Sequence, residues 1–226
     1  MNLLSGLGPF FALDSHPPGA EPAQPWRPLA EVLDDGPVLR QRVAGVQEVL
    51  AAGGGRVELR VAASVAHLGM VARLCSPALA LAAGHGRVPD FAGAWWQPTV
   101  GGAVPLSLRE NAIGRPPAVV AAFDERILQG PVARLDRAVA GFSLAENVRR
   151  GNVASALNGA ATVLRSQRPE WTAAITELLG GLERLPALAG TATRTGGRFR
   201  RRSCCLIYRA APDHAGPKCG DCVLTG

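Results

Sequence analysis

Lysine and aromatic side chains are scarce in this chain. Among its 226 residues, Lys218 is the only lysine, Tyr208 is the only tyrosine, and aromatic residues make up 5%. Positive charge is therefore carried almost entirely by arginine, and no positive side chain precedes Arg27. A secretory signal peptide begins with a positively charged segment, which is missing here. We expect a cytoplasmic protein.

Several short motifs that carry particular chemistries are also missing. The sequence contains no P-loop, no dinucleotide-binding fingerprint and no H-E-x-x-H pattern. The run Gly53–Gly55 follows a helical pattern, and we interpret it as a helix terminator rather than a phosphate cradle. The longest uncharged run, 91–108, is broken by prolines and glycines and cannot form a membrane-spanning helix. We expect no nucleotide or flavin site of the chain's own.

The net charge of +6 and the pI near 9.7 permit nucleic-acid, membrane-surface or acidic-protein partners. Most arginines are scattered, which favours a solvated surface over a nucleic-acid-binding face, and we expect no nucleic-acid partner. One group is different, because it leads directly into the cysteines of the tail. It consists of Arg194, Arg198, Arg200, Arg201 and Arg202.

Apolar periodicity predicts an α+β protein that is mainly α, with a helical body, a small β element and a short C-terminal tail. Residues 1–35 are rich in proline and glycine and are predicted to be a partly ordered N-terminal segment. Residues 36–190 are predicted to be the helical body, and residues 191–226 a separate C-terminal segment. This last segment is too short to hold a hydrophobic core of its own, and it needs a cross-link to keep its fold, which its cysteines can supply.

Predicted helices occupy 37–50 and 57–75, the second ended or kinked by Pro77. Further helices are predicted from Pro131, after a Ser143–Glu146 capping box, and from Pro169 to a stop at Gly180–Gly181. The helix after the capping box carries a stripe of mostly small apolar residues. This stripe comprises Val153, Ala156, Leu157, Ala160, Ala161 and Leu164.

Strands are predicted between these helices, where prolines and glycines interrupt the chain. Short extended segments are expected at 87–110, around the Gly101–Gly102 turn, and another at 118–123. Residues 187–200 are interpreted as a linker. Trp95 and Trp96 could line a ligand surface, but core or turn packing is favoured about two to one.

Four of the five cysteines lie in the last 26 residues: Cys204, Cys205, Cys219 and Cys222. The Cys219–Cys222 pair forms a C-x-x-C elbow, in which two thiolates can grip one metal atom. Cys204 and Cys205 are adjacent and would point to opposite faces of a strand, so both reach one site only if the backbone bends.

In a reducing compartment clustered thiols indicate metal ligands rather than disulfides. Spacing alone leaves a zinc site and an iron–sulfur cluster equally open. The fifth cysteine, Cys75, lies on the apolar face of a predicted helix and is expected to be a buried small hydrophobe. His214 is interpreted as a loop residue rather than a ligand. His16, His67 and His85 are expected not to meet any carboxylate motif.

The tail "RRSCCLIYR…CGDC" resembles the C-terminal motif of the siderophore-iron reductase (FhuF-like) family. It shares with that family the vicinal cysteines, the Tyr208–Arg209 pair and the final Cys-Gly-Asp-Cys. A second segment, "GNVASALNGA" at 151–160, resembles a helix of actinobacterial-type members. The chain departs from its relatives in a slightly longer loop between Cys205 and Cys219. It also has Arg149–Arg150 where an apolar-aromatic pair is expected.

The resemblance implies that 191–226 is an iron–sulfur tail holding a [2Fe–2S] cluster. The implied ligands are Cys204, Cys205, Cys219 and Cys222. It further implies a ferric-siderophore reductase, which passes one electron from the cluster to siderophore-bound Fe(III) and releases Fe(II) in iron acquisition. The arginines before the tail are expected to raise the cluster potential and to dock an acidic electron donor, such as a ferredoxin or flavodoxin.

The expected substrate is a ferric siderophore, with the hydroxamate type favoured, and the resemblance leaves room for peripheral contact with the inner membrane. Two other functions stay open at this point. One is a zinc-stapled adaptor that binds protein or nucleic acid through its basic tail. The other is an iron–sulfur electron carrier that has no siderophore substrate.

Overall fold

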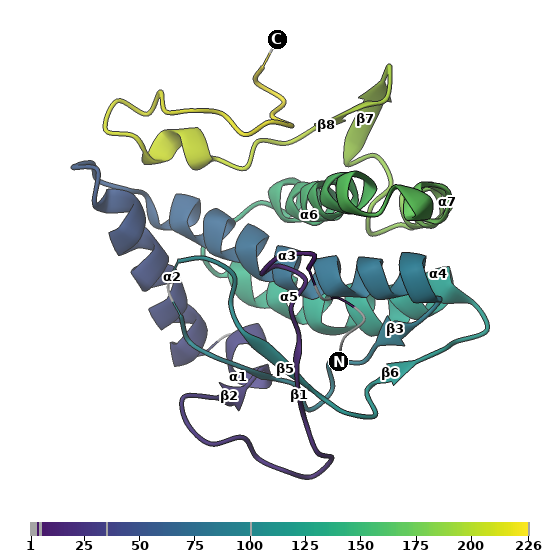
Figure 1. The fold of residues 1–226 in the computed structure, drawn as a ribbon. Helices are drawn as coiled ribbons and strands as arrows, with labels where there is room; N and C mark the ends of the chain where they lie inside the picture. The colour runs from purple at the N-terminus through teal and green to yellow at the C-terminus, as the bar shows by residue number, and fades with distance from the viewer. Residues whose placement is uncertain (1–3, 5, 35, 100, 226) are drawn as a thin grey trace.

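The computed structural model describes residues 4, 6–34, 36–99 and 101–225, and its elements confirm the predicted class (Figure 1). The helices are α1 (Ala30–Leu33), α2 (Pro37–Ala51), α3 (Leu59–His85), α4 (Val119–Phe123), the π-helix η2 (Asp124–Val132), α5 (Ala133–Ala140), α6 (Glu146–Gln167), the 3-10 helix η3 (Pro169–Trp171), α7 (Thr172–Leu182) and the 3-10 helix η4 (Ile207–Ala210). The strands are β1 (Asp14–His16), β2 (Arg27–Pro28), β3 (Val88–Pro89), β4 (Trp95–Trp96), β5 (Leu106–Arg109), β6 (Ile113–Gly114), β7 (Ala192–Thr195) and β8 (Arg198–Arg201).

The packed pair α3 and α6 forms the centre of the molecule, and the tail lies over it (Figure 1). The predicted stripe of α6 is confirmed, because all six of its residues are buried. The small side chains Ala156, Ala160 and Ala161 let the helix backbones approach closely. The tail thus rests on a closely packed helix pair of the core.

Of the two outcomes predicted for Pro77, an end or a kink of its helix, the end does not occur. Helix α3 runs through Pro77 to His85, and Gly86 closes it in the left-handed conformation with φ +60°. A proline inside a helix costs about 3 kcal/mol. Leu74, Leu79 and Leu81 are fully buried around it, and each such side chain contributes about 1.5–3 kcal/mol. Burial therefore offsets the cost of the proline.

Helix α3 is also long and apolar enough to cross a membrane, judged by length and composition. Its most apolar window is 78% buried inside the protein. Core helices of soluble proteins pass the same test, and the burial of α3 matches that case.

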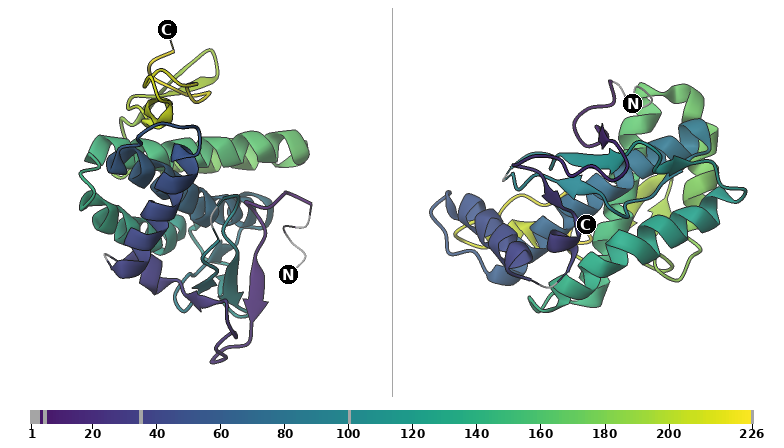
Figure 2. Two further views of the ribbon diagram at one scale, coloured as in Figure 1. Left: turned by 90° about the vertical axis from the view of Figure 1, so that its left-hand side faces the viewer. Right: turned by 90° about the horizontal axis from the view of Figure 1, so that it is seen from below.

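A small four-stranded sheet of order β1–β5–β4–β2 packs on the other side of α3 from the tail (Figure 2). Strand β1 pairs in parallel with β5, and the other pairs are antiparallel. The predicted extended segments around Gly101–Gly102 are thereby confirmed. The N-terminal segment is tied to the body by the buried Arg73, which donates to the carbonyl groups of Val104 and Ala12 at 2.6 and 2.8 Å.

Two predictions from short patterns fail. Residues 118–123 form helix α4 and not a strand, since a short apolar run has no period that separates the two. The Ser143–Glu146 capping box does not form. The N-cap of α6 is Ala145, without a side-chain cap, and Ser143 lies outside the helix at φ +57°.

Glycine pairs account for two further corrections. Helix α7 continues past Gly180–Gly181 to Leu182, because Gly181 serves close packing: a Cβ there would lie 2.8 Å from Val120 Cγ2. The expected linker contains the hairpin β7–β8. Its Gly196–Gly197 loop has φ values of +57° and +80°, the left-handed conformation that two-residue hairpin loops require.

Candidate metal centre

The yellow C-terminal tail, which carries the four cysteines, lies above the α3–α6 pair in both Figure 1 and the left view of Figure 2. The hairpin β7–β8 leads into them, and β8 ends at Arg201, so Cys204 and Cys205 lie outside any strand. The backbone turns directly after them, since Leu206 adopts φ +70°. A bulky residue in the left-handed region is a genuine outlier and marks a constrained turn. This turn follows the vicinal pair and does not lie between Cys204 and Cys205.

The four sulfurs are gathered as two pairs. Cys205 Sγ lies 3.5 Å from Cys219 Sγ, and Cys204 lies within hydrogen-bonding reach of Cys222. Cys205 and Cys222 are buried, whereas Cys204 and Cys219 are half-buried. Each pair therefore joins one buried sulfur to one that solvent reaches.

Backbone N–H groups point at two of these sulfurs. Leu206 N donates to Cys204 Sγ at 3.3 Å, and Leu224 N donates to Cys222 Sγ at 3.3 Å. Such donors stabilise thiolate and tune metal–sulfur centres. The turns that follow Cys205 and Cys222 supply them.

Two of these thiols, Cys204 and Cys219, have a raised pKa. Burial raises the pKa of Cys204, and the neighbouring cysteines raise it further. Burial also raises the pKa of Cys219, together with its contacts to Cys205 and Asp221. Metal binding must therefore displace protons from the site.

Helix α6 seats the tail through three residues on one face. Gly151 leaves room for the tail, because a Cβ there would lie 2.1 Å from Ser203 Oγ. Asn152 accepts a hydrogen bond from Arg201 at 2.7 Å, and Ser155 Oγ donates to the Asp221 carboxylate. The segment 151–160, quoted for its resemblance, is thus the seat of the cysteine tail.

A buried hydrogen-bond chain runs from the tail into the body. Arg201 can only donate, so Asn152 turns its oxygen to it and its amino group to the ring nitrogen His67 Nδ1, at 3.2 Å. His67 Nε2 then carries the proton and donates to Asp136 Oδ1 at 2.6 Å. The prediction that His67 meets no carboxylate is wrong, since the partner lies 69 residues away in sequence and no local pattern links them.

Helix α3 and the turn before it hold the other side of the tail. Ser64 Oγ donates to the carbonyl of Cys205 at 2.8 Å, and Arg209 pairs with Glu58 at 2.5 Å. At Gly55 a Cβ would lie 3.0 Å from Pro212 Cα. The tail is therefore anchored to both central helices.

The remaining candidates lie outside the cysteine site. Trp96 is buried in the core and Trp95 is half-buried. Both positions suit packing residues. Cys75 is fully buried, and burial raises the pKa of its thiol to about 12. His214 Nδ1 pairs with the carbonyl of Arg209 at 2.9 Å. Arg150 donates to the carbonyl groups of residues 186, 187 and 189, which is a structural role.

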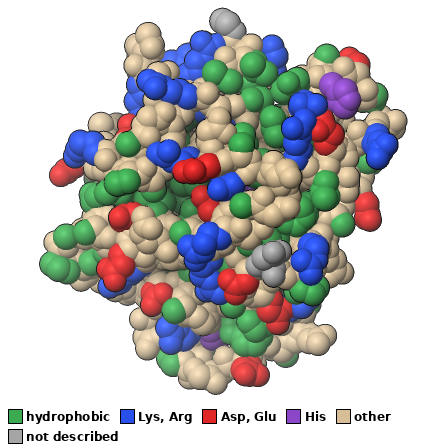
Figure 3. Space-filling view, turned by 180° about the vertical axis from the view of Figure 1, so that it is seen from behind, with side chains coloured by type: hydrophobic (Ala, Val, Ile, Leu, Met, Phe, Trp, Pro, Cys, Tyr) green, Lys and Arg blue, Asp and Glu red, His purple; other side chains and the backbone are tan. Residues whose placement is uncertain are grey.

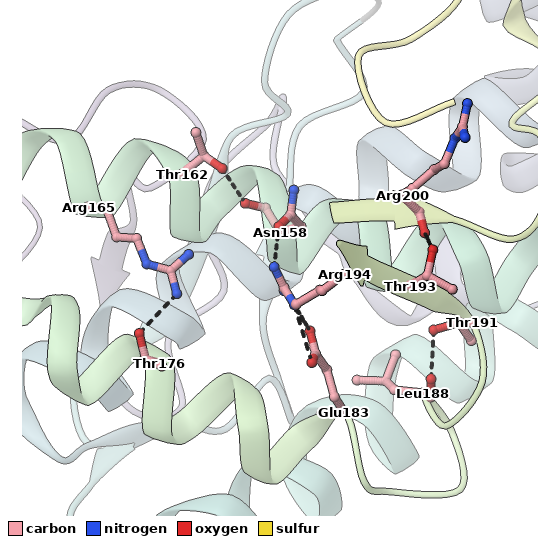
Figure 4. A network of polar contacts seen from close by, with 10 residues as sticks. All are labelled: Asn158, Thr162, Arg165, Thr176, Glu183, Leu188, Thr191, Thr193, Arg194 and Arg200. Carbon is pink, nitrogen blue, oxygen red and sulfur yellow. Dashed lines mark hydrogen bonds and ion pairs between the residues drawn. The ribbon is translucent and has the colours of Figure 1, made fainter. Parts of the chain in front are cut away.

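A cavity of about 260 Å³ lies between the hairpin, α6 and α7. Arg194, Glu183 and Asn158 line this cavity. Arg194 Nη2 donates to Glu183 Oε1 at 2.6 Å, and Arg194 Nη1 donates to Asn158 Oδ1 at 3.4 Å (Figure 4). None of the four tail cysteines lines this cavity. The network fixes the hairpin on α7, and with it the strand that leads to the cysteines.

Ser155→Ala should loosen the Cys219–Cys222 elbow by removing its bond to Asp221. Because Asp221 is half-exposed, we expect a loss of about 1 kcal/mol, below the usual range for charged partners. Hydrogen exchange in 201–224 should then rise roughly fivefold. Thr162→Ala is the matched control, since its hydroxyl bonds only to Asn158 within α6. Equal exchange in the two variants would show that Ser155 does not anchor the tail.

An all-cysteine site on a short tail defines a metal–thiolate protein. Residues 201–224 match the family model described as the FhuF 2Fe-2S C-terminal domain, and the four tail cysteines fit its motif. This confirms the resemblance to the FhuF-like family over the tail, and its cofactor is a [2Fe–2S] cluster. The chain is thus an iron–sulfur protein related to siderophore-iron reduction. No curated protein matches the chain.

The residues of the tail fit this cofactor. The site offers four sulfurs in two pairs, with backbone N–H donors aimed at two of them. Within the described residues, no three His, Cys, Asp or Glu side chains are grouped to hold a single metal ion. Four thiolates are the usual ligand set of a two-iron cluster. Cys204, Cys205, Cys219 and Cys222 would hold it.

Proposed function

We propose that this protein is a ferric-siderophore reductase. The cluster, bound by Cys204, Cys205, Cys219 and Cys222, would supply one electron at a time to Fe(III) held in a hydroxamate siderophore, and an external donor would replace it. Fe(II) binds hard oxygen ligands more weakly than Fe(III), so the reduced iron leaves the siderophore. The observation that carries the proposal is the FhuF-type tail, in which Cys204 and Cys219 are half-buried and Cys205 and Cys222 are buried.

The chain's own residues hold and present the site. Helices α3 and α6 fix the tail through Ser64, Asn152 and Ser155. The half-exposed Cys204 and Cys219 mark the edge at which a bulky ferric complex could approach. The proposal places this reaction in the cytoplasm, where free thiols stay reduced, with peripheral contact to the inner membrane.

The electron donor is proposed to be an acidic protein. Arg198, Arg202 and Lys218 are exposed on the tail and its hairpin. Figure 3 shows Lys and Arg side chains gathered at the top of the molecule, where the tail lies. Opposite charge accelerates the encounter of two proteins, and salt screens it. Reduction by a ferredoxin or flavodoxin should therefore slow as ionic strength rises.

The test is single-turnover reoxidation of the dithionite-reduced protein. We expect a ferric hydroxamate to speed reoxidation at least about tenfold over buffer. The Ga(III) complex of the same siderophore is the control, because it matches the ferric complex in shape and charge but accepts no electron. Equal reoxidation rates with the Fe(III) and Ga(III) complexes would assign the protein to electron carriage without a siderophore substrate.

A further inference from the structure

One guanidinium, packed between helix α6 and the start of the tail, is buried without a charged partner among the described residues. Arg201 is 1% exposed. Its Nη2 donates to Asn152 Oδ1 at 2.7 Å, and more weakly to Val148 O and Ser203 Oγ at 3.4 and 3.5 Å. All three acceptors are uncharged. Its Nε and Nη1 have no hydrogen-bond partner among the residues that the structure describes.

A buried cation of this kind is costly unless an anion compensates it. Arginine stays protonated in proteins, so it cannot escape the cost by losing its charge. An uncompensated buried charge costs several kcal/mol. The nearest acid of the tail, Asp221, accepts from Ser155 through its carboxylate and meets Arg201 only through its backbone oxygen, at 3.1 Å. The described side chains therefore leave the charge of Arg201 unpaired.

The position of Arg201 in the chain indicates which anion compensates it. It lies three residues before Cys204, and its backbone N–H bonds to Asp221, between Cys219 and Cys222. Arg201 is thus tied to both halves of the cysteine site. A cluster on four thiolates carries net negative charge, and reduction adds one more. A cluster held by the four tail cysteines would supply the missing counter-charge.

The other arginines before the tail differ from it. Arg198 and Arg202 are exposed to solvent, and Arg194 is paired with Glu183. Arg200 is half-buried and donates to the carbonyl of Cys222 at 3.3 Å. Water screens an exposed charge, so Arg198 and Arg202 should act more weakly on the cysteine site than a buried arginine does.

We propose that Arg201, oriented by Asn152, is the fixed counter-charge of the cluster and a main determinant of its reduction potential. The guanidinium favours the reduced state because that state carries the larger negative charge. This inference rests on the cluster and the four-cysteine site, and not on a siderophore as electron acceptor. Its failure would therefore leave the proposed function untouched.

The test compares midpoint potentials of Arg201→Gln, Arg201→Lys and Arg202→Gln in the full-length protein, measured by spectroelectrochemistry on the holoprotein. Arg201→Gln should make reduction roughly tenfold less favourable, which lowers the potential by about 59 mV for a one-electron couple. Arg201→Lys keeps the charge and should retain most of the potential. Arg202→Gln removes the same charge from an exposed position, and its change in the reduction equilibrium should stay under about twofold.

Equal shifts in Arg201→Gln and Arg202→Gln, or no shift in either, would overturn the proposal. If Arg201→Gln binds no cluster, the iron content of Arg201→Lys decides whether Arg201 acts through its charge or through packing. A cluster retained by the lysine variant near the wild-type potential supports a role for charge. Loss of the cluster from both Arg201 variants, with Arg202→Gln fully loaded, would assign Arg201 to packing alone and reject the proposal.

Discussion

We expect Cys222→Ser to give a colourless protein with a folded helical body. Cys222 is 1% exposed and sits in a turn whose N–H from Leu224 points at its sulfur. A serine hydroxyl stays protonated at neutral pH and cannot replace this thiolate, so we expect iron to fall to less than about a fifth of the wild-type content. The helices of the body contain none of the four tail cysteines, and far-UV circular dichroism should be unchanged. Iron analysis and the visible spectrum give the readout.

Cys75→Ala is the matched control for this variant. Cys75 is the one cysteine outside the tail and is fully buried in α3. Its replacement leaves a small cavity, which should cost about 1 kcal/mol of stability and no iron. A Cys222→Ser protein that retains a full cluster would refute the ligand assignment, and so would loss of the cluster from Cys75→Ala with its fold intact.

Gly151→Ala should detach the tail from helix α6. The added Cβ would lie 2.1 Å from Ser203 Oγ and 3.0 Å from Arg201 Nη2. In an open helix alanine stabilises by about 1 kcal/mol over glycine, whereas overpacking a close contact costs about 1–3 kcal/mol. We expect the cost of the clash to exceed the gain in helix propensity, since the clash also displaces Arg201 from Asn152. Faster hydrogen exchange in 201–224 and faster cluster loss to a chelator should follow.

Gly159→Ala is the matched control in the same helix, and we expect it to stabilise the protein where Gly151→Ala destabilises it. A Cβ at Gly159 meets no atom within 4 Å, so helix propensity acts alone and the variant should be slightly more stable than the wild type. If Gly151→Ala behaved like Gly159→Ala in thermal melts and kept its cluster equally long, α6 would not be the seat of the tail.

Patterns within single elements predicted much of the fold. The apolar stripe of α6 and the C-x-x-C elbow are both local, so sequence spacing was enough to place them. Side-chain packing in the core explains two of the failures. The core overrides the helix-breaking tendency of Pro77, and Val120 packs where Gly181 leaves space. The hairpin at 192–201 was missed although Gly196–Gly197 between two short extended runs is a recognised turn pattern.

The surroundings of the cysteines could not be predicted from spacing. Asp136 reaches His67 across 69 residues, and Ser64 reaches Cys205 across 141. Such pairs depend on how α3, α5, α6 and the tail pack together. The basic run before the cysteines predicted an electrostatic role for the group. Only burial separates Arg201 from its exposed neighbours.

The metal content of anaerobically purified protein tests the central claim most directly. The account predicts a red-brown protein with about two iron atoms per chain and little zinc. After dithionite reduction it should give the EPR signal of a one-electron-reduced [2Fe–2S] centre. A colourless preparation that contains about one zinc per chain and no iron would contradict the account and leave a zinc-stapled tail on a helical body.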